Sequence, residues 1–223
     1  MTSRHTTPEI RISSEWNKLL SSDPNCPHVS VKPFLPDKEI ILLNDVFSQS
    51  ECSALVSEAE KHGFGHTDYP HSYRGNLRLI TTDFSLADAL WARIKNSAPL
   101  RITFDDGEYE AVGLNEVWRI AKYRPGDKFC KHCDASFVDK SRNIESMFTV
   151  NIYMNGGFEG GETSFHLDGV RHDITPHAGL CLLFRQPPGQ SYYHEGQELR
   201  SGFKYLFRSD IMYRPVLQYC SQG

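Results

Sequence analysis

The hydrophobic pattern divides the chain into a first half with helical periodicity and a second half of short β-type runs. The continuous apolar run 40–43 predicts a buried strand. The capping box Ser48–Glu51 precedes apolar residues at helical spacing, and the helix it opens is expected to end at Gly63. Residues 85–88 are expected to open a second helix, which must end before Pro99.

Two stretches show neither period. Residues 1–36 contain several prolines near their end and are expected to form an N-terminal extension with a short helix near 15–20. Residues 64–82 mix glycine, histidine, tyrosine and arginine, so a surface loop is expected there. Aromatic and arginine side chains in such a loop can also hold a substrate.

After residue 113 the helical period gives way to short runs rich in β-branched and aromatic residues, with glycine and proline turns between them. These runs are 116–123, 147–154, 161–167, 180–184 and 203–213. Many short strands are typical of a sandwich or barrel, and helices gathered before them would cover one face. The expected fold is mainly β with flanking α-helices. It places a double-stranded β-helix (jelly roll) at about 113–214 and helical support at 48–98, within one domain at 37–223.

The composition is that of a folded domain. The chain has 223 residues, 24 Lys+Arg against 28 Asp+Glu, and 39% hydrophobic residues. The mild acidity argues against a nucleic-acid partner. No apolar stretch approaches the roughly 18 residues of a membrane span, and the first residues lack the apolar core of a signal peptide. We therefore expect a cytoplasmic protein without a membrane partner and leave its oligomeric state open.

The six cysteines are expected to stay reduced, because a chain of this length does not need disulfides. Cys130 and Cys133 form a C-x-x-C pair, which invites a zinc or redox interpretation. Zinc would need two further close ligands, and no second C-x-x-C exists, so a structural role is favoured. Most of the ten histidines, including His166, His172 and His177, are expected to lie at the surface.

Three residues have the chemistry of a metal centre. His132 and Asp134 are two positions apart in a β-type run, so their side chains would share one face. His194 follows in a later run. Two histidines and one carboxylate on one face of a metal leave positions open for a co-substrate and O₂, as non-haem Fe(II) oxygenases require. An H-x-D pair is common by chance, so a further signal is needed.

Lys204 is that signal. It lies ten residues after His194 and would have the same strand parity if the chain stays extended. A lysine inside an apolar barrel is costly unless it pairs with an anion. A dicarboxylate co-substrate would supply one.

These residues resemble the prolyl 4-hydroxylase-like branch of the Fe(II)/2-oxoglutarate-dependent dioxygenases. The matching stretches, in order, are 119–134, 149–155, 160–165 and 194–205. The resemblance implies the cofactors of that family: Fe(II), 2-oxoglutarate as co-substrate, and O₂, with ascorbate as an optional reductant.

The resemblance also implies roles for individual residues. His132, Asp134 and His194 would bind the iron and form the catalytic centre, and Lys204 would pair with the distal carboxylate of 2-oxoglutarate. Three further residues would belong to the co-substrate pocket: Tyr153 as a hydrogen-bond donor to that carboxylate, and Tyr123 and Thr163 as lining residues. Tyrosine and threonine are also ordinary strand residues, so a role in the core is the alternative for these three.

The implied activity is hydroxylation of a C–H bond in a peptide or small-molecule substrate. A prolyl or other protein side chain is favoured, because 64–78 lies where enzymes of this branch have a loop over a peptide groove. A free amino acid or a small natural product is the alternative. Collagen is not favoured, because the peptide-binding domain and secretory signal of the collagen-type enzymes are not recognised.

Two readings from other classes are kept. The first is a non-catalytic jelly-roll binding module, against which the intact set of two histidines, aspartate and lysine argues. The second is a cupin-like zinc or manganese enzyme that does not need 2-oxoglutarate, for which Lys204 would be dispensable.

Overall fold

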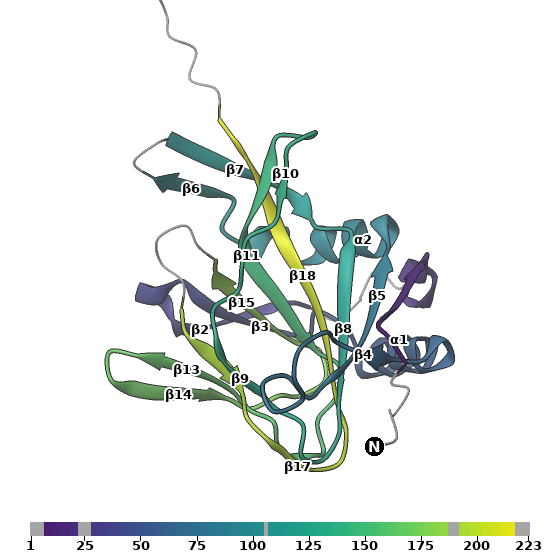
Figure 1. Cartoon of the computed structure of the whole chain (residues 1–223). Coiled ribbons are helices and arrows are strands. Elements are labelled where there is room, and N and C mark those ends of the chain that lie inside the picture. The colour runs from purple at the N-terminus through teal and green to yellow at the C-terminus, as the bar shows by residue number, and fades with distance from the viewer. Residues whose placement is uncertain (1–6, 22–27, 105–106, 187–191, 217–223) are drawn as a thin grey trace, which may run out of the picture.

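The computed structural model describes residues 7–21, 28–104, 107–186 and 192–216. A large β-sheet crosses the molecule, a smaller sheet lies against one of its faces, and the helices pack on the other side (Figure 1). The expected class, mainly β with flanking helices and a double-stranded β-helix core, is confirmed.

The larger sheet has a main path of strands with shorter strands paired at its margins. In spatial order the main path is β1 (Ile10–Ser13), β5 (Leu77–Thr82), β8 (Val117–Tyr123), β18 (Lys204–Pro215), β11 (Ile144–Tyr153), β15 (Leu180–Arg185), β3 (Ile40–Asn44) and β2 (Ser30–Leu35). The shorter strands are β4 (Gly65–His66), β6 (Arg101–Phe104), β7 (Gly107–Leu114) and β10 (Val138–Asp139). The order differs from the sequence order, so residues far apart along the chain become neighbours.

The smaller sheet carries strands that are short and antiparallel. In spatial order they are β14 (Val170–Ile174), β13 (Thr163–Leu167), β16 (His194–Gly196) and β9 (Phe129–His132). A separate pair, β12 (Glu159–Gly160) with β17 (Leu199–Ser201), lies where the chain passes from β16 to β18. Two facing sheets of mainly antiparallel strands form the jelly roll, with β1 and β5 as a parallel pair at the margin of the larger sheet.

The helices begin where side-chain caps satisfy their first backbone N–H groups. The capping box predicted at Ser48 is present, and α1 (Gln49–His62) follows it. The second helix, α2 (Phe84–Ile94), begins earlier than predicted, because Asp83 rather than Ser85 accepts the hydrogen bond from the Leu86 N–H. Short 3₁₀ turns complete the set: η1 (Trp16–Leu19), η2 (Pro36–Lys38) and η3 (Lys95–Ser97). Among the described residues, no helix is long and apolar enough to cross a membrane.

The interpretation of 64–82 as a loop is wrong at both ends. Its first residues form β4 and its last residues form β5, whose Leu79 and Ile80 are buried. The 77–82 segment has no clear alternation, since Leu79, Ile80 and Thr81 are all buried, and its strand forms by pairing with β8. The N-terminal segment also contributes to the sheet, through β1 and β2, and Trp16 is buried against the helices.

The two faces of the larger sheet carry different residues, because side chains alternate along each strand. On β8, Trp118 and Ile120 pack against the helices, while the residues between and after them face the smaller sheet. On β18, Phe207 and Ile211 pack against the helices in the same way. The other face of these strands, toward the smaller sheet, therefore carries the polar residues of the site.

Candidate active site

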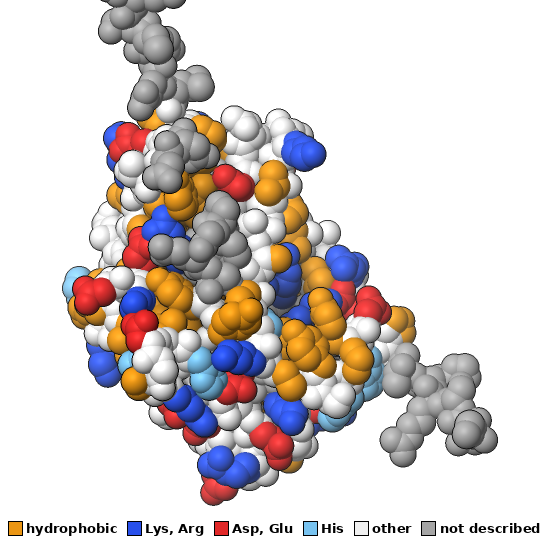
Figure 2. All heavy atoms as spheres, turned by 60° about the vertical axis from the view of Figure 1, so that its left-hand side comes forward, with side chains coloured by type: hydrophobic (Ala, Val, Ile, Leu, Met, Phe, Trp, Pro, Cys, Tyr) orange, Lys and Arg blue, Asp and Glu red, His pale blue; other side chains and the backbone are white. Residues whose placement is uncertain are grey.

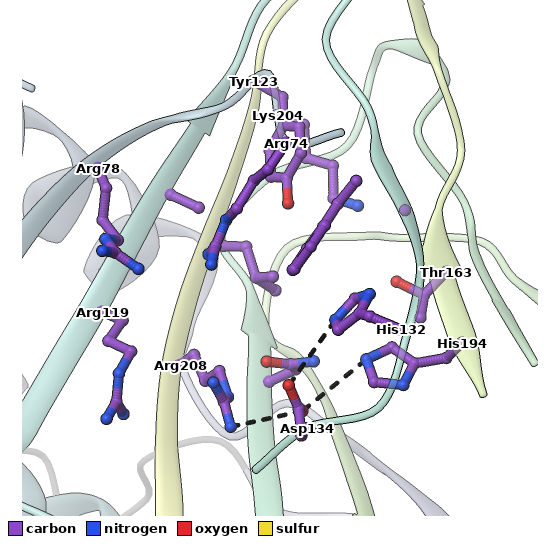
Figure 3. Close-up of a pocket in the computed structure, with 15 residues that line it drawn as sticks. Arg74, Arg78, Arg119, Tyr123, His132, Asp134, Thr163, His194, Lys204 and Arg208 are labelled. Carbon is purple, nitrogen blue, oxygen red and sulfur yellow. Dashed lines mark ion pairs between the residues drawn. The ribbon is translucent and has the colours of Figure 1, made fainter. Parts of the chain in front are cut away.

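The three predicted metal ligands come together on the smaller sheet. β9 and β16 pair so that His132 lies opposite His194, and Asp134 follows two residues after His132. One ligand atom from each residue lies within 4.8 Å of the others. His132 Nε2 is 3.8 Å from Asp134 Oδ1, and His194 Nε2 is 3.8 Å from Asp134 Oδ2 (Figure 3). Asp134 lies just beyond the end of β9, so the loop, not strand parity, directs its carboxylate.

Backbone carbonyls fix the orientation of both imidazoles. Nδ1 of His132 donates to the carbonyl oxygen of Cys130 over 2.8 Å, and Nδ1 of His194 donates to that of Tyr192 over 3.1 Å. A carbonyl only accepts, so each neutral ring carries its proton on Nδ1 and keeps a lone pair on Nε2. Burial lowers the pKa of His132 to about 4 and lowers that of His194, which keeps both rings neutral near pH 7.

The carboxylate of Asp134 is held in its charged form. Burial raises its pKa, but Arg208, the two imidazoles and the Thr149 hydroxyl outweigh that effect and lower the pKa to about 2. Thr149 donates to Asp134 Oδ2 over 2.8 Å, and Arg208 Nη2 lies 3.4 Å from the same oxygen. The arrangement is therefore an anion beside two neutral nitrogen donors, which is the ligand set of a 2-His-1-carboxylate centre.

Lys204 lies in the same pocket, on β18 of the larger sheet. It is buried, its Nζ donates to the carbonyl oxygen of Gly161 over 2.5 Å, and within the described part of the chain no carboxylate lies at ion-pair distance. Burial lowers the pKa of Lys204 to about 7, with Glu162 opposing the shift. Gly161 has φ 69°, a conformation that favours glycine, and an added Cβ would lie 3.3 Å from Lys204 Cδ.

The parity argument for Lys204 is wrong, although the residue is in the pocket. His194 belongs to the smaller sheet and Lys204 to the larger one, and the chain between them turns through β17 and Gly202, which has φ 81°. The two side chains meet because the sheets face each other. Parity along one extended strand plays no part.

The three residues predicted for the co-substrate pocket lie in different positions. Tyr123 and Thr163 line the pocket, and the Lys204 ammonium lies 5.1 Å from the centre of the Tyr123 ring. Tyr153 is fully buried behind them, and its hydroxyl donates to Thr163 Oγ1 over 2.6 Å. Burial raises the pKa of Tyr153, so the phenol stays protonated.

The pocket contains polar residues that the sequence pattern did not single out. About 560 Å³ of empty space, its open mouth included, lies between the sheets. Arginines line one side of it: Arg74, Arg78, Arg119 and Arg208. One of them, Arg119, could have been recognised from the sequence, because it is a charged residue between the apolar residues Trp118 and Ile120 of a predicted strand.

Phe129 connects this side of the pocket to the metal-ligand cluster. Its ring stacks on the imidazole of His132, with ring centres 3.5 Å apart and an angle of 18° between the planes. The guanidinium of Arg74 lies 4.3 Å from the centre of the same ring. The three groups thus form one stack.

The other candidate ligands lie apart from the cluster. Cys130 and Cys133 are free thiols, as are Cys52 and Cys181. Of the six cysteines expected to stay reduced, Cys26 and Cys220 lie outside the described residues. His166 pairs with Glu195 over 2.7 Å, which directs that carboxylate away from His194. Among the described residues, the group that could hold a metal is His132, Asp134 and His194.

Comparison with known proteins supports the class that the site indicates. Residues 118–209 match the model of the 2OG-Fe(II) oxygenase superfamily, and that range includes the three clustered ligands and Lys204. No curated protein sequence matches the chain.

Three similar solved structures are prolyl hydroxylases. A viral collagen prolyl hydroxylase from Paramecium bursaria Chlorella virus-1, in its 2OG complex, has a TM-score of 0.58 at 20% identity, covering 80% of this chain and 98% of that one. A Pseudomonas putida prolyl-4-hydroxylase has a TM-score of 0.58 at 17% identity, covering 79% and 94%. A Trichoplax adhaerens prolyl hydroxylase, in complex with a hypoxia-inducible-factor peptide fragment, has a TM-score of 0.59 at 16% identity, covering 79% and 84%.

Residues 118–209 are therefore similar to the 2OG-Fe(II) oxygenases, and this match together with the His-Asp-His cluster supports a dioxygenase that uses Fe(II), 2-oxoglutarate and O₂. Within that class it resembles the prolyl 4-hydroxylases, as the sequence predicted.

Proposed function

We propose that the chain hydroxylates a C–H bond of a prolyl or other side chain in a peptide, with His132, Asp134 and His194 as the iron ligands and Lys204 as the residue that binds 2-oxoglutarate. The convergence of two Nε2 lone pairs and one carboxylate within 4.8 Å carries the proposal. Bound Fe(II) with 2-oxoglutarate and O₂ supplies the oxidation of the C–H bond, with release of succinate and CO₂.

The ligand set fits Fe(II) chemically. Imidazole nitrogen and carboxylate oxygen suit iron, and three protein ligands leave room for a co-substrate. The backbone acceptors of Cys130 and Tyr192 hold the rings, and Thr149 holds the carboxylate of Asp134. These partners would keep the ligands in place when the metal binds.

Lys204 fits the distal carboxylate of 2-oxoglutarate. A buried ammonium whose hydrogen-bond acceptor is a carbonyl gains most from a carboxylate placed beside it. Thr163 lies in the same pocket and is held by Tyr153, so the two hydroxyls would act as a connected pair. Tyr153 then orients Thr163 by donating to its Oγ1, which leaves the Thr163 hydroxyl proton for the co-substrate, and Tyr123 forms the wall beside the ammonium.

A peptide substrate is supported by the segment before β5. Its backbone pairs with β9, the strand that carries His132: Cys130 N–H donates to the Tyr73 carbonyl and Gly75 N–H to the Lys128 carbonyl. This segment, 67–76, borders the pocket through Arg74. The similar Trichoplax enzyme was solved with a peptide fragment, which favours the same use here. A free amino acid or small molecule is the alternative substrate.

The first experiment tests the metal and co-substrate sites. Anaerobic addition of Fe(II) and 2-oxoglutarate should produce the visible charge-transfer band of the bound pair. His132→Ala should lose the band, whereas His177→Ala, an exposed histidine, should keep it. If wild-type protein gave no band, the proposed site would be wrong. If Lys204→Ala left 2-oxoglutarate affinity unchanged, the assignment of that residue would be wrong.

The second experiment tests turnover. Succinate release is measured under O₂ across peptide and amino-acid libraries, with loss of 2-oxoglutarate as a parallel readout. Release that depends on a peptide would support the proposed substrate class, and release with free amino acids alone would favour the alternative. A band without succinate for any candidate would favour a non-catalytic binding module.

A further inference from the structure

Arginine side chains gather on one side of the pocket, opposite the two histidines (Figure 3). They come from neighbouring strands of the larger sheet: Arg78 from β5, Arg119 from β8 and Arg208 from β18. Arg119 and Arg208 are direct cross-strand partners. Arg78 is two residues from Ile80, the partner of Arg119, so it faces the same side.

This gathering differs from the charge distribution on the molecular face shown in Figure 2. On the molecular face shown in Figure 2, basic and acidic side chains are interspersed and neither sign dominates. The chain as a whole carries a net charge of −4. Like charges directly opposite on adjacent strands destabilise a sheet. A set of arginines facing one cavity in an acidic protein therefore needs a compensating anion.

Carboxylates compensate only part of this charge. Arg78 pairs with Glu9. Arg119 and Arg208 share Asp210, and each of these two arginines lies 3.2 Å from an oxygen of that carboxylate. Arg208 also lies 3.4 Å from Asp134, whose charge the iron would use. In the part of the chain that the structure describes, Arg208 Nε is buried and has no hydrogen-bond acceptor.

Arg74 has no carboxylate partner among the described residues. Its Nε donates to Asn76 Oδ1 over 3.0 Å, and its guanidinium stacks on Phe129, while its terminal nitrogens have no hydrogen-bond acceptor among the described residues. Its backbone neighbours, Tyr73 and Gly75, are hydrogen-bonded to the segment that begins β9. Arg74 is thus a positioned cation with free donors, and such preorganisation lowers the cost of binding an anion.

Asn151 adds a second polar group beside the arginines. It is buried on β11 directly opposite Arg208, it lines the pocket, and its Oδ1 has no donor among the described residues. A ligand with an anionic oxygen for the arginines and an N–H for Asn151 would satisfy both. A carboxylate next to an amide or amine has this pair of groups.

We propose that the substrate carries a carboxylate and that Arg74 binds it, with Arg78, Arg119 and Arg208 supplying the surrounding positive charge. This proposal rests on the proposed function and narrows its substrate class. The carboxylate belongs either to an acidic side chain near the hydroxylated residue of a peptide or to a free amino acid. Arg74 is then a specificity-determining residue, since a planar guanidinium recognises a carboxylate through two parallel hydrogen bonds.

The test uses probe pairs that differ only in a carboxylate. Short proline-containing peptides with Asp or Glu are paired with the same peptides carrying Asn or Gln, and free glutamate is paired with free glutamine. Binding to the 223-residue chain loaded with Mn(II) and saturating 2-oxoglutarate is measured by calorimetry, so that turnover is not required. Arg74→Gln removes the charge, Arg74→Lys keeps it without the fork, and Arg171→Gln removes an exposed arginine of β14 as the matched control.

Wild-type protein should bind at least one acidic probe about tenfold or more tightly than its amide partner, as expected for hydrogen bonds to a charged group. The preference should disappear in Arg74→Gln, weaken in Arg74→Lys and persist in Arg171→Gln, while the affinity for 2-oxoglutarate stays the same in all four proteins. Preference for the peptide pair or for the free amino acid pair identifies the source of the carboxylate.

Three results would overturn the proposal. Equal binding of acid and amide probes by wild type would show that the pocket has no site for a substrate carboxylate. A preference that survives in Arg74→Gln would remove Arg74 from it, and loss of 2-oxoglutarate affinity in that variant would assign the arginine to the co-substrate instead. The proposed function is judged separately, by the charge-transfer band and succinate release of wild-type protein, which do not depend on the acid–amide comparison.

Discussion

The hydroxyl of Thr149 donates a hydrogen bond to Asp134 Oδ2 over 2.8 Å and in turn accepts one from Gln186 Nε2 over 2.8 Å. Gln186 is itself fixed, because its Oε1 accepts from Ser146 and its Nε2 also donates to Asp210. All of these groups are buried. The proposed iron-binding carboxylate is therefore oriented by a chain of hydrogen bonds that begins on β11 and β18.

Replacing Thr149 with valine should weaken iron binding without unfolding the protein. Valine keeps the shape of the side chain but leaves Asp134 Oδ2 without its hydroxyl partner, and loss of such an outer partner costs about 10–100-fold in metal affinity. Competition with a chelator measures the change. Thr81→Val is the control, because Thr81 is also buried but donates to Ser14, away from the site. Equal iron affinity in both variants would contradict the prediction.

Glu51 should make folding sensitive to acid. Its carboxylate accepts from the Ser48 and Ser21 backbone N–H groups and forms a two-point pair with Arg93, which joins α1 to α2. Burial raises the pKa of Glu51, but these partners outweigh it and lower the pKa to about 2. The stabilisation is complete above the unfolded pKa, near 4.5, and is lost as the pH falls toward 2.

The measurement is urea unfolding of wild type and Glu51→Gln as a function of pH. The variant should be less stable by about 3 kcal/mol near neutral pH, and the difference should shrink as the pH falls below about 4.5. Glu198→Gln, at an exposed glutamate, should follow wild type throughout. A difference between wild type and Glu51→Gln that stays constant with pH would refute the assigned role of ionisation.

Local patterns predicted the parts of the fold that local physics decides. The capping box at Ser48 and the run at 40–43 need only neighbouring residues, and both are present. Helix α2 has its N-cap at Asp83, two residues before Ser85, because aspartate and serine both cap helices and it is the Asp83 side chain that accepts from the Leu86 N–H. The segment 77–82 was misjudged because β5 owes its place to β8, a strand far along the chain.

The proposed metal ligands could be predicted from the sequence, because their residue types form an uncommon combination. The other polar residues of the site could not, because the order of strands in the sheet brings them together. A histidine, a carboxylate and a second histidine with a later lysine form an unusual set, so the cluster could be anticipated. The arginines could not, because Arg78, Arg119 and Arg208 become neighbours only through the order β5, β8, β18. Lys204 was found for a partly wrong reason: it reaches the pocket from the opposite sheet.

The affinity for 2-oxoglutarate should depend on pH through Lys204. Its pKa without an anion is lowered by burial to about 7, and pairing with a carboxylate raises it. Below pH 7 the ammonium is already formed, so the affinity is flat. Above pH 7 binding must take up a proton, so Kd should rise by up to about tenfold per pH unit.

Calorimetry in buffers of different ionisation enthalpy measures both the affinity and the proton uptake of Mn(II)-loaded protein. Lys204→Arg is the matched control: a guanidinium stays charged in this range, so any binding that the variant retains should be independent of pH. If wild-type Kd were constant from about pH 7 to about pH 9 with no proton uptake, Lys204 would not be the titrating group.

Replacing Lys204 with methionine should stabilise the protein without ligands while abolishing 2-oxoglutarate binding. The buried ammonium has no carboxylate beside it in the described chain, so a neutral side chain of similar length should raise the unfolding free energy by about 2 kcal/mol. Because the folded pKa is lowered, the gain should be largest below pH 7 and should decrease as the pH rises toward the unfolded pKa of 10.5. Saturating Mn(II) and 2-oxoglutarate should reverse the order, since ligand binding stabilises wild type alone. Thermal unfolding of both proteins with and without ligands measures this, and a variant less stable than wild type in the ligand-free state would show that Lys204 is a structural residue.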